Sequence, residues 1–133
     1  MVEKALITGI TGFAGSHLAE LLLKEGYQVY GTCRPRSKTD NIDHLKNKIS
    51  LEDADILDSH SLYSIMVKIK PDFVFHLAAQ SFVQTSWASP ATTMETNVVG
   101  SVHLFEAIRR AGISPAIQIA CSSEEYGMVY ENE

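Results

Sequence analysis

Short apolar runs alternate along the 133-residue chain with longer stretches in which apolar side chains recur every three or four positions. Runs of the first kind predict buried β-strands, and stretches of the second kind predict amphipathic helices. Strands that alternate with helices favour an α/β protein with a doubly wound parallel sheet between two helical layers. We expect strands at residues 4–8, 28–32, 49–53, 73–77 and 117–121, and helices at residues 12–25, 59–70 and 90–111.

The ends of the expected helices carry residues that favour capping. Gly26 and Gly112 follow the first and last helices as candidate C-caps, and Asp58 or Ser59 can cap the second helix at its N-terminus. Within the last helix, apolar residues at helical spacing predict a stripe buried against the sheet. This stripe comprises Val98, Val102, Phe105 and Ile108.

Three glycines separate the first strand from the first helix, in the order Gly9-x-x-Gly12-x-x-Gly15. They allow a sharp turn, close approach of a pyrophosphate to the backbone, and close packing of the helix on the strand. The helix N-terminus then offers unpaired amides to the anion. A tight connection without a ligand is the alternative, but the position between strand and helix favours a dinucleotide site in a Rossmann-like, three-layer α/β/α domain. Its expected residues are Gly9, Thr11, Gly12, Phe13, Ala14 and Gly15.

The end of the second strand predicts which nicotinamide dinucleotide binds. NAD-binding members of this fold place an acidic residue there to bind the ribose 2′-hydroxyl, whereas an arginine accommodates the 2′-phosphate of NADP. This chain has no acid at that point and carries Arg34, with Arg36 and Ser37 close behind. We therefore expect NADP to bind in preference to NAD, with Arg34 as the first phosphate ligand. A solvated basic loop is the alternative.

Asp55 and Ile56 follow the third strand at the same predicted edge of the sheet. There, a carboxylate can accept a hydrogen bond from the adenine amino group, and an apolar side chain can pack against the ring. Capping of the following helix is the competing explanation for the aspartate. Both residues remain candidates for the adenine end of the cofactor site.

Composition restricts the class of partner. A net charge of −5, with 45% hydrophobic and 20% charged residues, is ordinary for a globular domain and argues against nucleic acid or an anionic membrane as partner. No apolar run is long enough to span a membrane, so a cytoplasmic location is the default expectation. Cys33 and Cys121 have no C-x-x-C spacing and are expected to be reduced structural thiols. The five histidines form no local cluster, so we expect no metal site.

Four segments together resemble the extended short-chain dehydrogenase/reductase family, and the resemblance covers nearly the whole chain. The first is the glycine turn with its longer spacing, and the others begin at His76, Asn97 and Cys121. They read His-Leu-Ala-Ala-Gln-Ser, Asn-Val-Val-Gly-Ser and Cys-Ser-Ser-Glu-Glu-Tyr-Gly. Within that family the chain is most similar to the GDP-mannose 4,6-dehydratases, which use NADP, and next to the GDP-4-keto-6-deoxymannose reductases. The resemblance implies a nucleotide-sugar substrate, GDP-mannose first, and a homo-oligomer at full length.

The resemblance also assigns roles to single residues. Leu77, Ala78 and Ala79 would form a loop against which the cofactor lies, and the small side chains leave room for it. Gln80 and Ser81 would face the nicotinamide and the sugar. Asn97 would steady this loop by hydrogen bonds, although a solvated amide on the helix surface is the alternative.

Ser122 and Glu124 would carry the chemistry. In the dehydratases the segment typically reads Ser-Thr-Ser-Glu-x-Tyr-Gly, so Ser122 replaces a threonine while Glu124 matches the acid/base glutamate. Hydride would pass from sugar C4 to NADP, Glu124 would remove the C5 proton and help to expel the C6 hydroxyl as water, and hydride would return to C6. Such a carboxyl group needs a raised pKa. Solvated loop acids are the alternative for Glu124 and Glu125.

The Tyr-x-x-x-Lys pair with which the family removes the C4 hydroxyl proton does not occur in this sequence. An unperturbed phenol is a poor base at neutral pH. We therefore expect the amino-terminal, cofactor-binding half of a longer enzyme, truncated after the fifth strand and inactive by itself. A 4-epimerase, a 4-ketoreductase and a non-catalytic dinucleotide-binding module are the alternatives.

Overall fold

The computed structural model describes residues 2–127, except for the side chains of Ser123 and Glu124. Five parallel strands form one sheet in the order β3-β2-β1-β4-β5. This order is the doubly wound arrangement expected from the sequence. Within residues 2–127, no helix is long and apolar enough to cross a membrane. The strands are β1 (Lys4–Thr8), β2 (Gln28–Cys33), β3 (Ser50–Asp53), β4 (Phe73–His76) and β5 (Ala116–Ile119).

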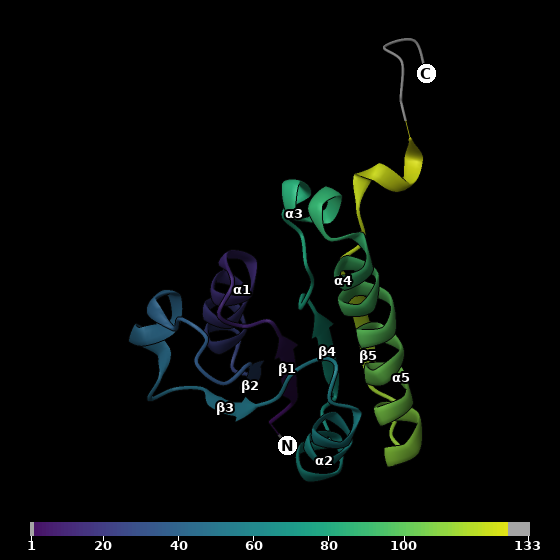
Figure 1. Ribbon diagram of the computed structural model, residues 1–133. Coiled ribbons are helices and arrows are strands. Elements are labelled where there is room, and N and C mark those ends of the chain that lie inside the picture. Colours follow the sequence, from purple (N-terminus) through teal and green to yellow (C-terminus); the bar gives the residue numbers. More distant parts are fainter. Residues whose placement is uncertain (1, 128–133) are drawn as a thin grey trace.

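Helices cover both faces of the sheet. On one face, α1 (Phe13–Lys24) and the 3₁₀-helix η1 (Asp40–Leu45) pack over β1 and β2. On the other face, α2 (Ser59–Ile69) and α5 (Gly100–Ala111) pack against each other, as Figure 1 shows. The three-layer α/β/α architecture expected from the sequence is therefore confirmed.

Alternate residues of the central strand β1 serve the two hydrophobic cores. Ala5 and Ile7 pack on the side of α1, while Leu6 packs on the side of α2 and α5. All three side chains are fully buried. Successive side chains of a strand point to opposite faces of the sheet, and both faces are covered here, so the side chains divide between the two cores. Thr8, at the carboxyl end of β1, is a buried polar residue.

Asp58 and Gly112 cap their helices as predicted, and Gly26 and Ser59 do not. Asp58 caps α2, because its carboxylate accepts hydrogen bonds from the backbone N–H groups of His60 and Ser61. Gly112 is the C-cap of α5 and has a φ angle of 65°, whereas Glu25 is the C-cap of α1 and Gly26, with a φ angle of 86°, is the residue after it. Ser59 is the first residue of α2 and not its cap.

The expected helix at residues 90–111 is present but is not uniform. It consists of α4 (Pro90–Met94), a π-helical turn, η2 (Glu95–Val99), and α5, and Figure 1 shows α4 and α5 as one continuous column. A separate short helix, α3 (Val83–Ala88), precedes it and was not predicted. Neither α3 nor η1 is long enough to display a clear helical period in the sequence.

The predicted buried stripe of this helix is wrong at three of its four positions. Val98, Val102 and Phe105 are 49%, 51% and 37% exposed, and only Ile108 is buried. The buried side of α5 instead includes Leu104 and Ala107, which pack in the core shared with α2. Both sides of the helix carry apolar residues at helical spacing, so periodicity alone did not identify the side that faces α2.

Candidate functional site at the carboxyl edge of the sheet

The glycine turn, residues 9–12, connects β1 to α1 and lies in close contact with the segment after β4. Gly9 has a φ angle of 73°, and a Cβ atom at this position would lie 2.9 Å from the backbone nitrogen of Ala78. A Cβ atom on Gly15 would lie 2.5 Å from the carbonyl oxygen of Gly9. Because Gly9 has no Cβ atom, the turn can lie directly against the backbone of Ala78. Because Gly15 has none, α1 can begin directly against the turn.

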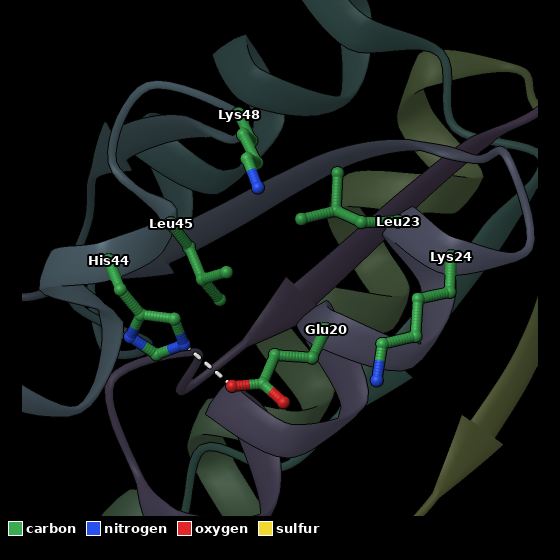
Figure 2. A pocket seen from close by; sticks show the side chains of 6 residues that line it. All are labelled: Glu20, Leu23, Lys24, His44, Leu45 and Lys48. Carbon is green, nitrogen blue, oxygen red and sulfur yellow. Dashed lines mark hydrogen bonds and ion pairs between the residues drawn. The ribbon is translucent and has the colours of Figure 1, made fainter.

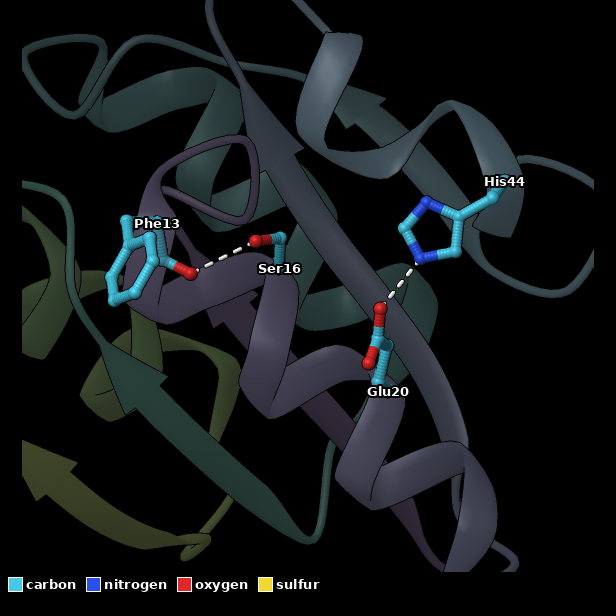
Figure 3. A network of polar contacts seen from close by, with 4 residues as sticks. All are labelled: Phe13, Ser16, Glu20 and His44. Carbon is cyan, nitrogen blue, oxygen red and sulfur yellow. Dashed lines mark hydrogen bonds and ion pairs between the residues drawn. The ribbon is translucent and has the colours of Figure 1, made fainter.

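The N-terminus of α1 faces this turn without a side-chain cap. Gly12 occupies the N-cap position, and the first helical turn contains no acidic residue. The first N–H groups of an α-helix have no acceptor within the helix, so the amides of Phe13, Ala14 and Gly15 are suited to an anion. Phe13 is 80% exposed, and its ring lies edge-on to His17 at 4.7 Å. Its carbonyl accepts a hydrogen bond from the Ser16 hydroxyl (Figure 3).

The β4–α3 loop, residues 77–82, is held at both ends by side chains from other elements. Near its start, the backbone N–H groups of Leu77 and Ala78 donate to the Thr8 hydroxyl, each at 3.2 Å. Further along, Asn97 in η2 makes two hydrogen bonds with the main chain of Gln80: it accepts from the N–H at 2.7 Å and donates to the carbonyl at 3.0 Å. Asn97 thus engages the loop and is not a solvated amide.

A cavity of about 490 Å³ opens beside this loop. It brings together seven residues that the sequence analysis assigned to the cofactor or the substrate: Leu77, Ala78, Ala79, Gln80, Ser81, Asn97 and Ser122. Ser86 and Thr93 also line it, from α3 and α4, and were not predicted. The Asn-x-x-x-Ser spacing of Asn97 and Ser101, another lining residue, places both on one side of a helix and is a signal that could have identified Ser101.

The expected adenosine end lies further along the same edge. Arg34 is exposed directly after β2, and Arg36 has a φ angle of 66° in the turn that follows. One carboxylate oxygen of Asp55 accepts a hydrogen bond from the N–H of Leu57, and Asp58, not Asp55, caps α2. Ile56 is 7% exposed and packs in the core on the side of α2 and α5, so its side chain offers little surface to an adenine ring.

The segment after β5 carries the expected catalytic residues. Ser122 is exposed at the cavity, and the backbone of residue 124 belongs to the 3₁₀-helix η3 (Ser123–Tyr126). The Glu124 side chain lies outside the described part of the chain. Cys33 and Cys121 are both free thiols, as expected, but Cys121 is exposed at the cavity and is not buried in the core. Among the side chains that the structure describes, no group of His, Cys, Asp and Glu could hold a metal ion.

The η1 segment reaches the glycine turn from the side of α1. The Asn41 amide donates to the Thr11 carbonyl at 2.9 Å. His44 lies 2.6 Å from Glu20 of α1, and this hydrogen bond lowers the pKa of the Glu20 carboxyl (Figures 2 and 3). A second hollow lies between the two helices, with Lys24 and Lys48 at its margins (Figure 2). Sequence reasoning missed the contact to Thr11 because Asn41 lies outside every predicted strand and helix.

A glycine turn at the head of a parallel sheet, closed by a small-residue loop after β4, defines the class as an extended short-chain dehydrogenase/reductase. Solved structures agree: the UDP-glucose 4-epimerase from Thermus thermophilus, in complex with NAD, matches with a TM-score of 0.86 and 30% identity. This match covers 98% of the present chain and 41% of that one. The Brucella ovis UDP-glucose 4-epimerase, also in complex with NAD, matches with a TM-score of 0.85 and 29% identity over 96% of this chain and 38% of its own.

The particular family follows from the sequence comparisons. The family model for GDP-mannose 4,6 dehydratase matches residues 6–133, and the chain belongs to this family. A GDP-mannose 4,6-dehydratase from Vibrio cholerae is 41% identical in an alignment of 142 positions that covers 98% of this chain and 38% of the relative. GDP-mannose 4,6 dehydratase 2 from Caenorhabditis elegans is 41% identical over 96% of this chain and 37% of its own length. The chain therefore spans well under half the length of these relatives.

Proposed function

We propose that this chain is the NADP-binding part of a GDP-mannose 4,6-dehydratase. The observation that carries the proposal is the contact between the glycine turn and the β4–α3 loop beside a cavity at the carboxyl edge of the sheet. In open α/β sheets this edge is where ligands bind. Membership of the dehydratase family supplies the reaction class, and relatives named for the same reaction support the substrate.

Different residues along this edge would bind different parts of the cofactor and the substrate. The amides of α1 and the bare backbone at Gly12 would hold the pyrophosphate. Ala78 and Ala79 would let the dinucleotide lie against the main chain, where larger side chains would obstruct it. NADP supplies a reversible hydride acceptor when bound. In this proposal Ser122 donates a hydrogen bond to the sugar, and Glu124 removes the C5 proton and protonates the departing C6 hydroxyl.

The choice of NADP depends on Arg34. A guanidinium pairs with a 2′-phosphate through charge-assisted hydrogen bonds, which NAD cannot form. Titration of the chain with NADPH and with NADH, followed by nucleotide fluorescence, tests this. We expect NADPH to bind more tightly and Arg34→Ala to weaken it on the order of tenfold, with little effect on NADH.

Arg109→Ala is the matched control, because Arg109 is paired with Glu106 at the far end of α5. Equal affinity for both nucleotides, or an equal loss of both in Arg34→Ala, would contradict the NADP assignment. A chain that binds neither nucleotide would contradict the proposed function itself.

The proposal also includes inactivity of the 133-residue chain alone, because the sequence contains no Tyr-x-x-x-Lys. Incubation with NADP and GDP-mannose is expected to yield no 4-keto product, and measurable turnover would overturn this part. Self-association, which the family resemblance implies, belongs to the same proposal. The exposed apolar residues Val98, Val102 and Phe105 on the outer side of η2 and α5 are compatible with it.

A nucleotide-sugar 4-epimerase is the second candidate, because solved relatives with this fold are named UDP-glucose 4-epimerases. Epimerisation at C4 needs no elimination across C5 and C6. A fusion of this chain to the carboxy-terminal part of the Vibrio cholerae relative separates the two. Glu124→Gln should abolish 4-keto-6-deoxy product in a dehydratase and spare turnover in an epimerase.

A further inference from the structure

We infer that His76 is a positioning residue, fixed as the neutral tautomer with its proton on Nε2, that holds the glycine-turn strand, the β4–α3 loop and α5 in one register. The functional part of this inference rests on the proposed function, because the segments that His76 joins are those expected to contact the dinucleotide. The assignment of the proton itself rests only on contacts within the protein.

His76 lies at the junction of three elements. It is the last residue of β4 and is paired in register with Thr8, the last residue of β1. The Thr8 hydroxyl lies 2.8 Å from His76 Nδ1, and the Ser101 hydroxyl of α5 lies 3.0 Å from His76 Nε2. His76 is 5% exposed, so water does not compete freely for either nitrogen.

The contacts of Ser101 in α5 show which nitrogen of His76 carries the proton. The Ser101 hydroxyl lies 2.6 Å from the carbonyl oxygen of Asn97, which can only accept. The single hydroxyl proton of Ser101 is therefore committed to Asn97. Toward His76, the Ser101 oxygen must accept, which places a proton on Nε2.

The β1 end gives the same answer independently. The Thr8 hydroxyl oxygen accepts from the backbone N–H of Ala78 and from that of Leu77, which also donates to the Thr8 carbonyl oxygen at 3.2 Å. A hydroxyl has two acceptor positions and one proton. With both acceptor positions used, Thr8 can only donate to His76, so Nδ1 carries no proton.

A single directed chain results. Hydrogen bonds run from the amides of the β4–α3 loop to Thr8, to His76, to Ser101 and to the Asn97 carbonyl. The Asn97 side chain returns to the same loop at Gln80. Both ends of the loop are thus tied to one histidine ring, and a change in the ring's proton would affect both attachments.

Protonation of His76 would disrupt this order. A second ring proton on Nδ1 would point at a Thr8 oxygen whose acceptor positions are occupied. The residues that contact or pair with His76 from β1, α5 and β5 are Thr8, Ser101 and Ile119, none of which is ionisable. Burial lowers the pKa of His76, in the direction that keeps the ring neutral.

The first test observes the tautomer directly. Nitrogen-15 NMR of the histidine rings in the 133-residue chain, without nucleotide, is expected to show His76 with a protonated Nε2 and an unprotonated Nδ1 at neutral pH. The opposite tautomer, a doubly protonated ring or an averaged mixture of tautomers would overturn the inference. This measurement does not depend on whether the chain binds a nucleotide.

The second test uses a matched pair of variants at Ser101. Ser101→Ala removes the acceptor for Nε2–H, and Ser101→Thr keeps a hydroxyl that can still donate to the Asn97 carbonyl. We expect Ser101→Ala to mix the His76 tautomers and to weaken NADPH binding about tenfold, and Ser101→Thr to restore both. Ser64→Ala is the control, since Ser64 makes the same bond to the carbonyl four residues earlier, in α2.

The possible results separate the two proposals. If the wild-type tautomer is as stated but neither NADPH nor NADH binds, the proposed function fails while the proton assignment stands. Two results would refute the positioning role of His76 and its hydrogen bonds. One is equal NADPH affinity of the wild type and Ser101→Ala, and the other is the same behaviour of Ser101→Thr and Ser101→Ala in both measurements.

Discussion

At the scale of single residues, the site depends on atoms that are missing as well as on atoms that are present. Gly9 has no Cβ atom where one would lie 2.9 Å from the Ala78 nitrogen, and Gly15 has none where one would meet the Gly9 carbonyl. Thr8, next to Gly9, contributes a hydroxyl that binds both the loop backbone and His76. The small residues allow the two segments to approach, and the threonine then fixes their separation.

Gly9→Ala tests this arrangement. The added methyl group must be accommodated at a φ angle of 73° and against the backbone of the β4–α3 loop, so both stability and NADPH affinity should fall. Gly26→Ala is the control, because its φ angle of 86° carries the backbone strain with nothing within 4 Å of the new atom. We expect Gly26→Ala to cost about 1 kcal/mol of unfolding free energy, and Gly9→Ala to cost more. Thermal unfolding and nucleotide titration measure the two effects, and equal losses in both variants would contradict the contact argument.

His76 predicts a pH dependence of stability with a definite sign. Burial lowers its pKa from the ordinary value of 6.5, so the unfolded chain takes up a proton at a pH where the folded chain does not. The free energy of unfolding should therefore decrease as the pH falls through about 6.5, with a slope of at most about 1.4 kcal/mol per pH unit from this group. The contribution levels off below the folded-state pKa.

Urea unfolding of the wild type and of His76→Gln, between about pH 7 and pH 5, measures this contribution. The other four histidines are common to both proteins, so the difference between the two slopes isolates His76. A slope that is unchanged in His76→Gln would show that the buried ring is not the source.

At the scale of elements, the sequence predicted the five strands and the three longest helical segments because each carries a clear period or an uninterrupted apolar run. It did not predict which side of α5 faces the core, since Val98, Val102 and Phe105 form as regular a stripe as the buried residues do. The contact of Thr8 with His76 also could not be predicted from the sequence. These residues lie 68 positions apart and meet only because β1 and β4 pair with the two in register.

The same limit applies to η1, whose role appears only when α1 is in place. Asn41 binds the carbonyl of Thr11 within the glycine turn, while the His44–Glu20 contact holds η1 against α1. Because η1 follows the Arg34 segment in the chain, it links the expected 2′-phosphate ligand to the expected pyrophosphate site. The sequence analysis predicted no strand or helix at residues 40–45.

Asn41→Ala is expected to weaken NADPH binding about fivefold, because it releases the Thr11 carbonyl and loosens the turn. Asn47→Ala provides the comparison, as Asn47 is an exposed asparagine in the connection between η1 and β3. Isothermal titration calorimetry would measure both variants. Equal NADPH affinity of Asn41→Ala and the wild type would contradict a role of η1 in supporting the glycine turn.

At the scale of the whole molecule, the sheet is well covered at its centre and exposed at one edge. Ile117 and Ile119 are paired with Val74 and His76 of β4 but remain 39% and 43% exposed, whereas Val74 is fully buried. No described strand pairs with the outer edge of β5. An apolar edge strand of this kind favours association between copies.

Ile117→Lys should therefore reduce association of the 133-residue chain at high concentration, because a charged side chain disfavours pairing at a strand edge. Val67→Lys on α2 is the matched control, since Val67 is 43% exposed but belongs to a helix. Light scattering over a concentration series would compare the two. Similar scattering from both variants would indicate that association, if it occurs, uses another surface.

The π-helical turn at Glu95–Val99 has a consequence for how this family can tolerate deletions. A π turn accommodates one residue more than a regular α-helical turn, and Asn97 lies at its middle. Loss of a single residue from this turn would give a more regular helix but would rotate Asn97 by about 100° around the axis, away from Gln80. Homologues in which an asparagine holds the loop after β4 should therefore also keep the π turn. Removal of the π turn by a one-residue deletion should make the helix more stable and weaken NADPH binding, because the loop loses its hydrogen bonds to Asn97.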